Sequence, residues 1–159
     1  MKIFLIIFLF QSFFLKGDTT VVALDRVHHS FGNSGNNRIF TETISFPNNI
    51  NQYTEITMNI NLECPNGGCD PWDRKAQISI ENRDQWFEIG RYVTPYGIEC
   101  GWSLDVSDYR SLLNGDVVLK SYIDTWVEPG WLVSISFDFI SGPPDYSYVA
   151  IRKVWNYPN

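Results

Sequence analysis

The sequence has 159 residues, of which 44% are hydrophobic and 19% are charged, and its formal net charge at pH 7 is −6. This composition is typical of one globular domain, because no repeat or charge block divides the chain. The acidic balance argues against a nucleic-acid partner, and we expect none, since binding to phosphates requires a basic surface.

The first 17 residues have the pattern of a signal peptide. Lys2 precedes an apolar run from Ile3 to Phe10. A run of this length is too short for a transmembrane helix and matches the hydrophobic region of an export signal. We therefore expect residues 1–17 to be a signal peptide, residues 18–159 to form a secreted domain, and no membrane segment to remain in the mature protein.

Apolar and polar residues alternate along most of the remaining chain. In Glu55–Leu62 every second residue is apolar, which is the period of a half-buried β-strand. One short helical turn is expected after Ser107 as its cap, closed at Asn114-Gly115. Strands without interleaved helices predict a single all-β domain, an antiparallel sandwich of jelly-roll or immunoglobulin-like type. The further predicted strands are 39–46, 75–80, 86–93, 117–126, 131–140 and 149–155.

The segment from Cys64 to Arg74 carries the strongest functional signal. Cys64 and Cys69 are separated by four residues, a spacing that suits a small disulfide-closed loop. Trp72, Asp73 and Arg74 lie three, four and five residues after Cys69, and a closed loop would fix their positions before a ligand arrives, as binding or catalysis requires. The alternative is a stapled surface turn without a functional role, which secreted β-proteins often carry.

The third cysteine, the two histidines and Met58 form no recognisable metal-binding site. Cys100 is left over, either as a buried thiol or for an intermolecular link. His28 and His29 adjoin each other far from the cysteines, so the spacing fits no zinc site, and with Met58 they form no convincing copper site. We expect no metal.

The predicted strand 117–126 has two different faces. Alternation places Lys120, Tyr122, Asp124 and Trp126 on the face away from the core. An acid beside two aromatic rings and a cation is a plausible platform for carbohydrate, because an aromatic ring can pack on the C–H face of a sugar. An ordinary solvated strand face fits the same pattern.

Five segments occur in an order and spacing that is similar to the first domain of the peptide-N-glycosidase F family. The resemblance extends from about Leu62 to Val154, is fainter over residues 24–46, and implies an eight-stranded antiparallel jelly roll. The segments are Cys64–Cys69 with Trp72-Asp73-Arg74, Glu88–Tyr96, Asp105–Leu113, Asp124-Thr125-Trp126 and Pro144–Tyr148.

The resemblance also implies an activity and residues for it. Enzymes of this family hydrolyse the amide between an asparagine side chain and the first N-acetylglucosamine of an N-linked glycan, without a metal or cofactor. The implied catalytic carboxylates are Asp73 and Asp124, and the implied substrate-binding residues are Arg74, Trp72 and Trp126. The expected partner is an N-linked glycan or a glycoprotein.

Two departures from the family pattern bear on catalysis. The family has a glutamate where this sequence has Asp124, which is one methylene shorter, and a displacement of about 1 Å can reduce a rate on the order of a hundredfold. The family's cleft lies between two jelly-roll domains, the second of which supplies another glutamate. The lone domain is therefore expected to be incomplete as an enzyme, with a second jelly-roll domain or chain as a further partner. A glycan-binding module without turnover and a structural interaction domain are the alternatives.

Overall fold

A computed structural model describes residues 18–153 of the chain. The predicted signal peptide, residues 1–17, lies outside the described residues, as do residues 154–159. No helix in the described part is long and apolar enough to cross a membrane.

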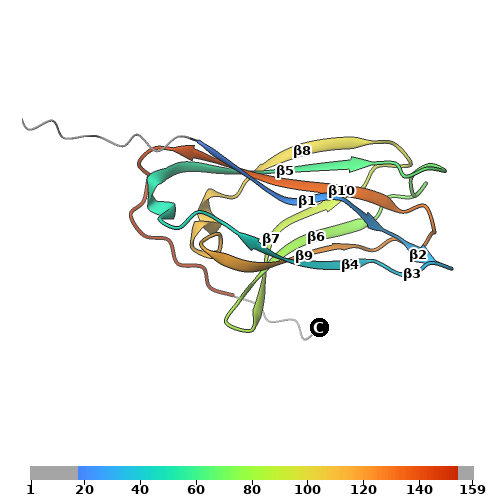
Figure 1. The fold of residues 1–159 in the computed structure, drawn as a ribbon, viewed down its shortest axis with the longest axis horizontal. Helices are drawn as coiled ribbons and strands as arrows, with labels where there is room; N and C mark the ends of the chain where they lie inside the picture. Colours follow the sequence, from blue (N-terminus) through green and yellow to red (C-terminus); the bar gives the residue numbers. More distant parts are fainter. Residues whose placement is uncertain (1–17, 154–159) are drawn as a thin grey trace, which may run out of the picture.

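Two four-stranded antiparallel sheets face each other (Figure 1). A small hairpin of β2 (Phe31–Gly32) and β3 (Gly35–Asn36) follows the first strand. The eight longer strands confirm the predicted antiparallel jelly roll in a single domain. The first sheet has the order β1 (Thr19–His29), β10 (Trp131–Ser141), β5 (Tyr53–Glu63) and β8 (Cys100–Asp105). The second has the order β4 (Ile39–Ser45), β9 (Asp116–Ile123), β6 (Lys75–Asn82) and β7 (Gln85–Val93).

The core lies between the two sheets and follows the alternation in the sequence. In β5, Ile56, Met58, Ile60 and Leu62 are all buried, as the period of two predicts. They pack against the inward side chains of the second sheet, and removal of this apolar surface from water is the main force that holds the layers together. The largest fully buried side chains of the described residues include Trp131, Tyr53, Phe137 and Phe139.

The strand predicted at residues 117–126 is β9, and its core face is confirmed. Leu119, Ser121 and Ile123 are fully buried. The prediction is wrong at the end of the strand, because regular pairing stops at Ile123 and the chain turns away. Asp124 and Trp126 therefore lie on the connection that follows β9 and not within it.

Two other predicted elements need correction. Residues 149–153 of the predicted strand 149–155 form no strand, and its last two residues lie outside the described part. The turn predicted after Ser107 is a 3-10 helix, η2 (Ser107–Leu112), but Val106 occupies its N-cap. The Ser107 hydroxyl instead accepts a hydrogen bond from the Ile56 N–H, at 2.9 Å. Gly115 closes the segment with a φ of 69°, as predicted.

Strands β1 and β8 were not predicted from the sequence, and a physical reason explains each omission. The pairing of β1 with β10 has register shifts between Val22 and Leu24 and again between Leu24 and Val27, so apolar residues do not alternate cleanly. Strand β8 is short, and its partly buried apolar residues are Cys100, Trp102 and Leu104, none of which is fully buried. A short helix, η1 (Ile50–Gln52), was also not expected.

Candidate functional site

The predicted site residues gather at one end of the sandwich, where connections from both sheets meet. Three backbone hydrogen bonds hold the connections together: Asp70 N–H to the Gly130 oxygen at 2.9 Å, Gly97 N–H to the Asp70 oxygen at 3.1 Å, and Phe31 N–H to the Val127 oxygen at 3.1 Å. The β5–β6 connection therefore lies against the β9–β10 connection and the β7–β8 connection, and the β2–β3 hairpin lies against the β9–β10 connection (Figure 1).

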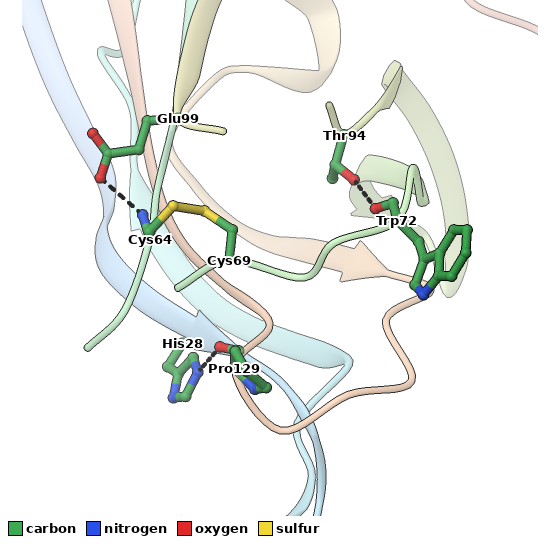
Figure 2. Close-up of a disulfide and its surroundings, with 7 residues drawn as sticks. All are labelled: His28, Cys64, Cys69, Trp72, Thr94, Glu99 and Pro129. Atoms are coloured by element: carbon green, nitrogen blue, oxygen red, sulfur yellow. Dashed lines mark hydrogen bonds between the residues drawn. A yellow bond between two sulfur atoms is a disulfide. The ribbon is translucent and has the colours of Figure 1, made fainter. Parts of the chain in front are cut away.

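The predicted disulfide between Cys64 and Cys69 is present at the start of the β5–β6 connection. Figure 2 shows it between the end of β5 and the segment that continues to Trp72. The Cys64 N–H donates to the Glu99 carboxylate at 3.1 Å, which ties the same point to the β7–β8 connection. Cys100 is a partly buried free thiol, and burial raises its pKa.

The most constrained residue of the site is Asp70, whose side chain is fully buried. Its carboxylate accepts hydrogen bonds from Arg74 Nε at 2.6 Å, from the Thr125 hydroxyl at 2.7 Å and from the Trp72 N–H at 3.0 Å. Burial raises the pKa of Asp70, but these donors together outweigh burial and hold the pKa below its usual value. Asp70 is therefore a charged anchor that joins two connections.

Arg74 is an internal partner of this anchor. Its Nε and Nη2 both contact Asp70, and its side chain is only 18% exposed. The sequence suggested a contact of Arg74 with substrate and did not suggest this ion pair. The structure thus places the guanidinium at the base of the site, with its position set by a buried carboxylate.

Trp72 and Asp73 are both exposed, and the backbone on either side of Asp73 is fixed. The Arg74 N–H donates to the Thr94 hydroxyl at 2.9 Å, and the Thr94 N–H donates to the Arg74 oxygen at 2.9 Å. The Thr94 hydroxyl also contacts the Trp72 oxygen at 3.4 Å. Trp72 is 58% exposed and projects away from the disulfide (Figure 2). Asp73 therefore offers a carboxylate to solvent from a rigid frame.

Asp124 is positioned by three groups, two of them in β6 and β9 and the third, Arg38, just before β4. Its N–H donates to the Lys75 oxygen at 2.9 Å, a single hydrogen bond just beyond the last regular pair of β9 with β6. The Tyr122 hydroxyl donates to Asp124 Oδ1 at 2.8 Å, and Arg38 Nη1 lies 3.6 Å from the same oxygen. Because Asp73 lies two residues before Lys75, the structure brings both predicted acids to the same end of neighbouring strands.

Arg38 was not predicted and organises the aromatic part of the site. Its guanidinium carbon lies 4.3 Å from the centroid of the Trp126 ring and 4.8 Å from that of Phe31. The two rings also meet edge to face, with centroids 5.2 Å apart. A guanidinium between aromatic rings is stabilised by their π faces. Trp126 is nevertheless 53% exposed, so one side of its ring remains accessible.

Strand β1 supports the site with two adjacent histidines. His28 Nε2 contacts the Pro129 oxygen at 2.7 Å and so holds the β9–β10 connection (Figure 2). His29 is fully buried, with Nδ1 3.2 Å from the Arg38 oxygen and Nε2 3.0 Å from the Ser121 hydroxyl. Burial lowers the pKa of His29 to about 4, so its ring is neutral at pH 7.

Gly130 allows the connection to approach β1 closely. Its φ is 56°, and a Cβ at this position would lie 1.8 Å from the His29 oxygen. Only glycine avoids this clash while adopting the left-handed conformation. The sequence marked Pro129-Gly130 only as a turn, because its contact with His29 joins residues 101 positions apart.

No group of three or more histidine, cysteine, aspartate or glutamate residues within residues 18–153 is arranged to hold a metal ion. The site therefore consists of an exposed acid, a second acid with a hydroxyl and a guanidinium beside it, and two exposed indole rings. Such a set can bind a polar ligand that has apolar faces and can orient water beside a carboxylate.

Comparisons with known proteins agree with this architecture. Residues 78–139 match the family described as "Peptide-N-glycosidase F, N terminal". That range contains Asp124 and Trp126 and begins after Arg74. The chain is also 38% identical over 144 residues to peptide-N(4)-(N-acetyl-beta-D-glucosaminyl)asparagine amidase F of Elizabethkingia miricola, an alignment that covers 86% of this chain and 40% of that protein.

Solved structures give the same relationship. The crystal structure of a peptide-N(4)-(N-acetyl-beta-D-glucosaminyl)asparagine amidase superposes with a TM-score of 0.78 at 37% identity, over 83% of this chain and 44% of that one. PNGase F from Flavobacterium meningosepticum, described as a glycosylasparaginase, gives a TM-score of 0.78 at 36% identity, over 84% and 45% of the two chains. The present chain thus spans less than half of the length of these relatives.

The fold and these similarities define a jelly-roll domain of the class found in glycan amidases. Within that class, the chain belongs to the peptide-N-glycosidase F N-terminal domain family.

The buried anchor gives a first prediction about stability. Asp70→Asn removes the charge that Arg74 and Thr125 share, so we expect the free energy of unfolding to fall by about 3 kcal/mol, the usual effect of breaking a buried pair. Urea unfolding measures this change. The matched variant Glu88→Gln breaks the exposed pair with Arg91 and should leave stability almost unchanged. Equal effects of the two variants would show that Asp70 is no anchor.

The buried imidazole of His29 gives a prediction about pH. Its pKa is about 4 in the folded protein and about 6.5 when unfolded, so only the unfolded state takes up a proton as the pH falls between these values. Stability should be full above pH 6.5 and decrease by about 3 kcal/mol towards pH 4. Urea unfolding across this range should show the slope in the wild type and in His28→Gln, but a much smaller one in His29→Gln. An unchanged slope in His29→Gln would contradict the assignment.

Proposed function

We propose that this domain is part of an amidase that cleaves the bond between asparagine and the first N-acetylglucosamine of N-linked glycans. The observation that carries the proposal is the exposed Asp73 carboxylate on a fixed backbone, at the same end of the sandwich as Asp124 and Trp126. The comparisons support it, because the relatives are named for this amidase activity.

Asp73 acts on the attacking water. Its carboxylate accepts a proton from water while the oxygen bonds to the side-chain amide carbon of the glycosylated asparagine. The bond from this carbon to nitrogen then breaks, the proton passes to the leaving glycosylamine, and the peptide keeps an aspartate. The fixed frame around Asp73 contributes by placing the carboxylate before the substrate arrives.

Asp124 and Trp126 form the substrate-binding side. The Tyr122 hydroxyl and the Arg38 guanidinium keep Asp124 oriented, with its side chain 38% exposed. The accessible side of Trp126, together with Trp72, offers indole faces to the sugar rings of the chitobiose core. Arg74 stabilises this end through Asp70 and approaches the ligand only with the part of the guanidinium that the carboxylate leaves uncovered.

An additional acidic residue, supplied by a second domain or chain, completes the cleft. Asp124 is shorter than the glutamate of the family, and the relatives are more than twice as long as the part of them that this chain matches. A second jelly-roll domain or chain is therefore the proposed partner. The protein acts outside the cytosol after export by residues 1–17, a location that the Cys64–Cys69 disulfide supports.

Glycan binding without turnover is the second candidate. It is favoured by the ion pair that holds Arg74 on Asp70, because a guanidinium committed in this way contributes less to catalysis while the exposed indoles still bind sugar. The two functions share a ligand and differ only in whether the amide bond is cleaved.

Glycan release tests catalysis. The protein, mixed with any second domain or chain that completes the cleft, should convert the glycosylated asparagine of a denatured N-glycoprotein to aspartate, detected as a mass increase of the deglycosylated peptide in heavy-oxygen water. Asp73→Asn should reduce the rate at least about a hundredfold, because a general base is removed. The exposed acid Asp84 provides the control variant Asp84→Asn. Release that is equal in both variants would exclude Asp73 as the base.

Sugar binding is tested separately by calorimetric titration with chitobiosyl-asparagine. Trp126→Ala should weaken binding about tenfold or more, since stacking and its desolvated area are lost. Trp86→Ala removes an indole from the outer face of the second sheet and should have no effect on this ligand. Equal affinities of the wild type and Trp126→Ala would contradict both candidate functions at this site.

A further inference from the structure

The outer face of the second sheet carries a groove whose lining shares Tyr122 and Lys75 with the candidate site but otherwise lies outside it. Its volume is about 850 Å³, within the usual range of ligand sites. It lies over β9, β6 and β7, and residues 151–153 of the C-terminal segment form one wall. This segment leaves the opposite end of the sandwich and returns past the second sheet (dark red in Figure 1).

The register of the sheet arranges the floor of the groove in rows. Tyr122, Gln77 and Arg91 lie opposite one another on β9, β6 and β7, and Lys120, Ser79 and Glu88 form the next row. Residues that are opposite each other in antiparallel strands point to the same face, so each row presents its side chains together. The floor is therefore set by backbone pairing and not by mobile loops.

The groove is basic although the chain is acidic. Glu88 is the acidic residue of its lining, and it is already bound by Arg91 at 2.7 Å and by Gln77. The formal charge of the lining is thus opposite to the net charge of −6 of the chain. The basic residues of the lining are Lys75, Arg91, Lys120, Arg152 and Lys153.

The three lysines of the lining are each held over an aromatic ring. The Lys120 ammonium lies 4.1 Å from the centroid of the Trp86 ring. The ammonium groups of Lys75 and Lys153 lie 5.9 Å from the Tyr122 and Phe87 centroids. Such contacts restrict the long side chains before a ligand binds, which reduces the entropy lost on binding.

Lys120 and Lys153 also repel each other. Burial and the nearby Lys153 lower the pKa of Lys120, and Glu81 opposes this shift. Placing an anion between like charges removes their repulsion and restores the pKa. The arrangement is therefore electrostatically suited to a bound anionic group.

We propose that this groove binds a short acidic oligosaccharide, with sulfate or carboxylate groups on Lys120 and Lys153 and sugar rings against Trp86 and Tyr122. The net charge of −6 opposes binding of a long polyanion such as nucleic acid, which would extend beyond the groove. Aromatic rings beside the cations favour a sugar over an acidic peptide, since a sugar ring has a C–H face for them. This site does not depend on the proposed amidase function.

Calorimetric titration with a heparin-derived tetrasaccharide tests the proposal. We expect saturable binding that weakens as salt is added, and no binding of neutral chitotetraose. Lys120→Gln and Lys153→Gln should each weaken binding about tenfold, the equivalent of one charge-assisted hydrogen bond. Arg83→Gln removes an equal charge from an exposed position outside the groove and should leave the affinity unchanged. Trp126→Ala should also leave it unchanged.

Three results would overturn the proposal. The first is equal affinity of the wild type and both lysine variants, and the second is an equal loss in Arg83→Gln, which would indicate general charge attraction. The third is equally tight binding of hexaglutamate, which would assign the groove to acidic peptides. As an independent readout, saturation with the tetrasaccharide should raise the pKa of Lys120 in an NMR titration of its ammonium group, and an unchanged pKa would contradict contact with that residue.

Discussion

The end of the sandwich that carries the candidate site depends on one buried carboxylate. Asp70 accepts hydrogen bonds from Arg74 and Trp72 on its own connection and from Thr125 on the connection after β9. If the two connections separated, the buried carboxylate would lose the Thr125 hydroxyl, and a buried charge that loses one of its donors costs about 1–3 kcal/mol. The anchor therefore allows the neighbouring residues to be exposed without being mobile, and this combination is what a binding or catalytic carboxylate requires.

The two acids of the proposed site lie in different surroundings. Asp124 has a tyrosine hydroxyl at 2.8 Å and a guanidinium at 3.6 Å, whereas Asp73 faces solvent from a backbone that Thr94 holds. In enzymes that use two carboxylates, such a difference separates the group that exchanges protons from the group that positions the substrate. The environment around Arg38 thus supports the assignment of Asp73 as base and of Asp124 as the orienting acid.

Local patterns in the sequence predicted the features that depend on local geometry. Alternation identified β5 and the core face of β9, and the spacing of Cys64 and Cys69 identified the disulfide. Long-range contacts were not predictable in this way. Asp70 meets Thr125 across 55 positions, and Arg38 collects Phe31 and Trp126 from separate segments. The disulfide loop and the alternation in residues 117–126 singled out Trp72, Asp73 and Trp126. Their expected roles came from a family resemblance, because spacing alone does not show which turn faces a cleft.

The order of the strands also determines when the end of the sandwich that carries the candidate site becomes organised during folding. Strand β1 supplies the two histidines that hold Pro129 and the backbone of Arg38, and it pairs with β10, so that Thr19 lies opposite Phe139. A growing chain cannot make these contacts until nearly all of the described residues have been synthesised. The acids and indoles are consequently assembled late, after the last strand has docked, and a nascent polypeptide carries them without their working arrangement.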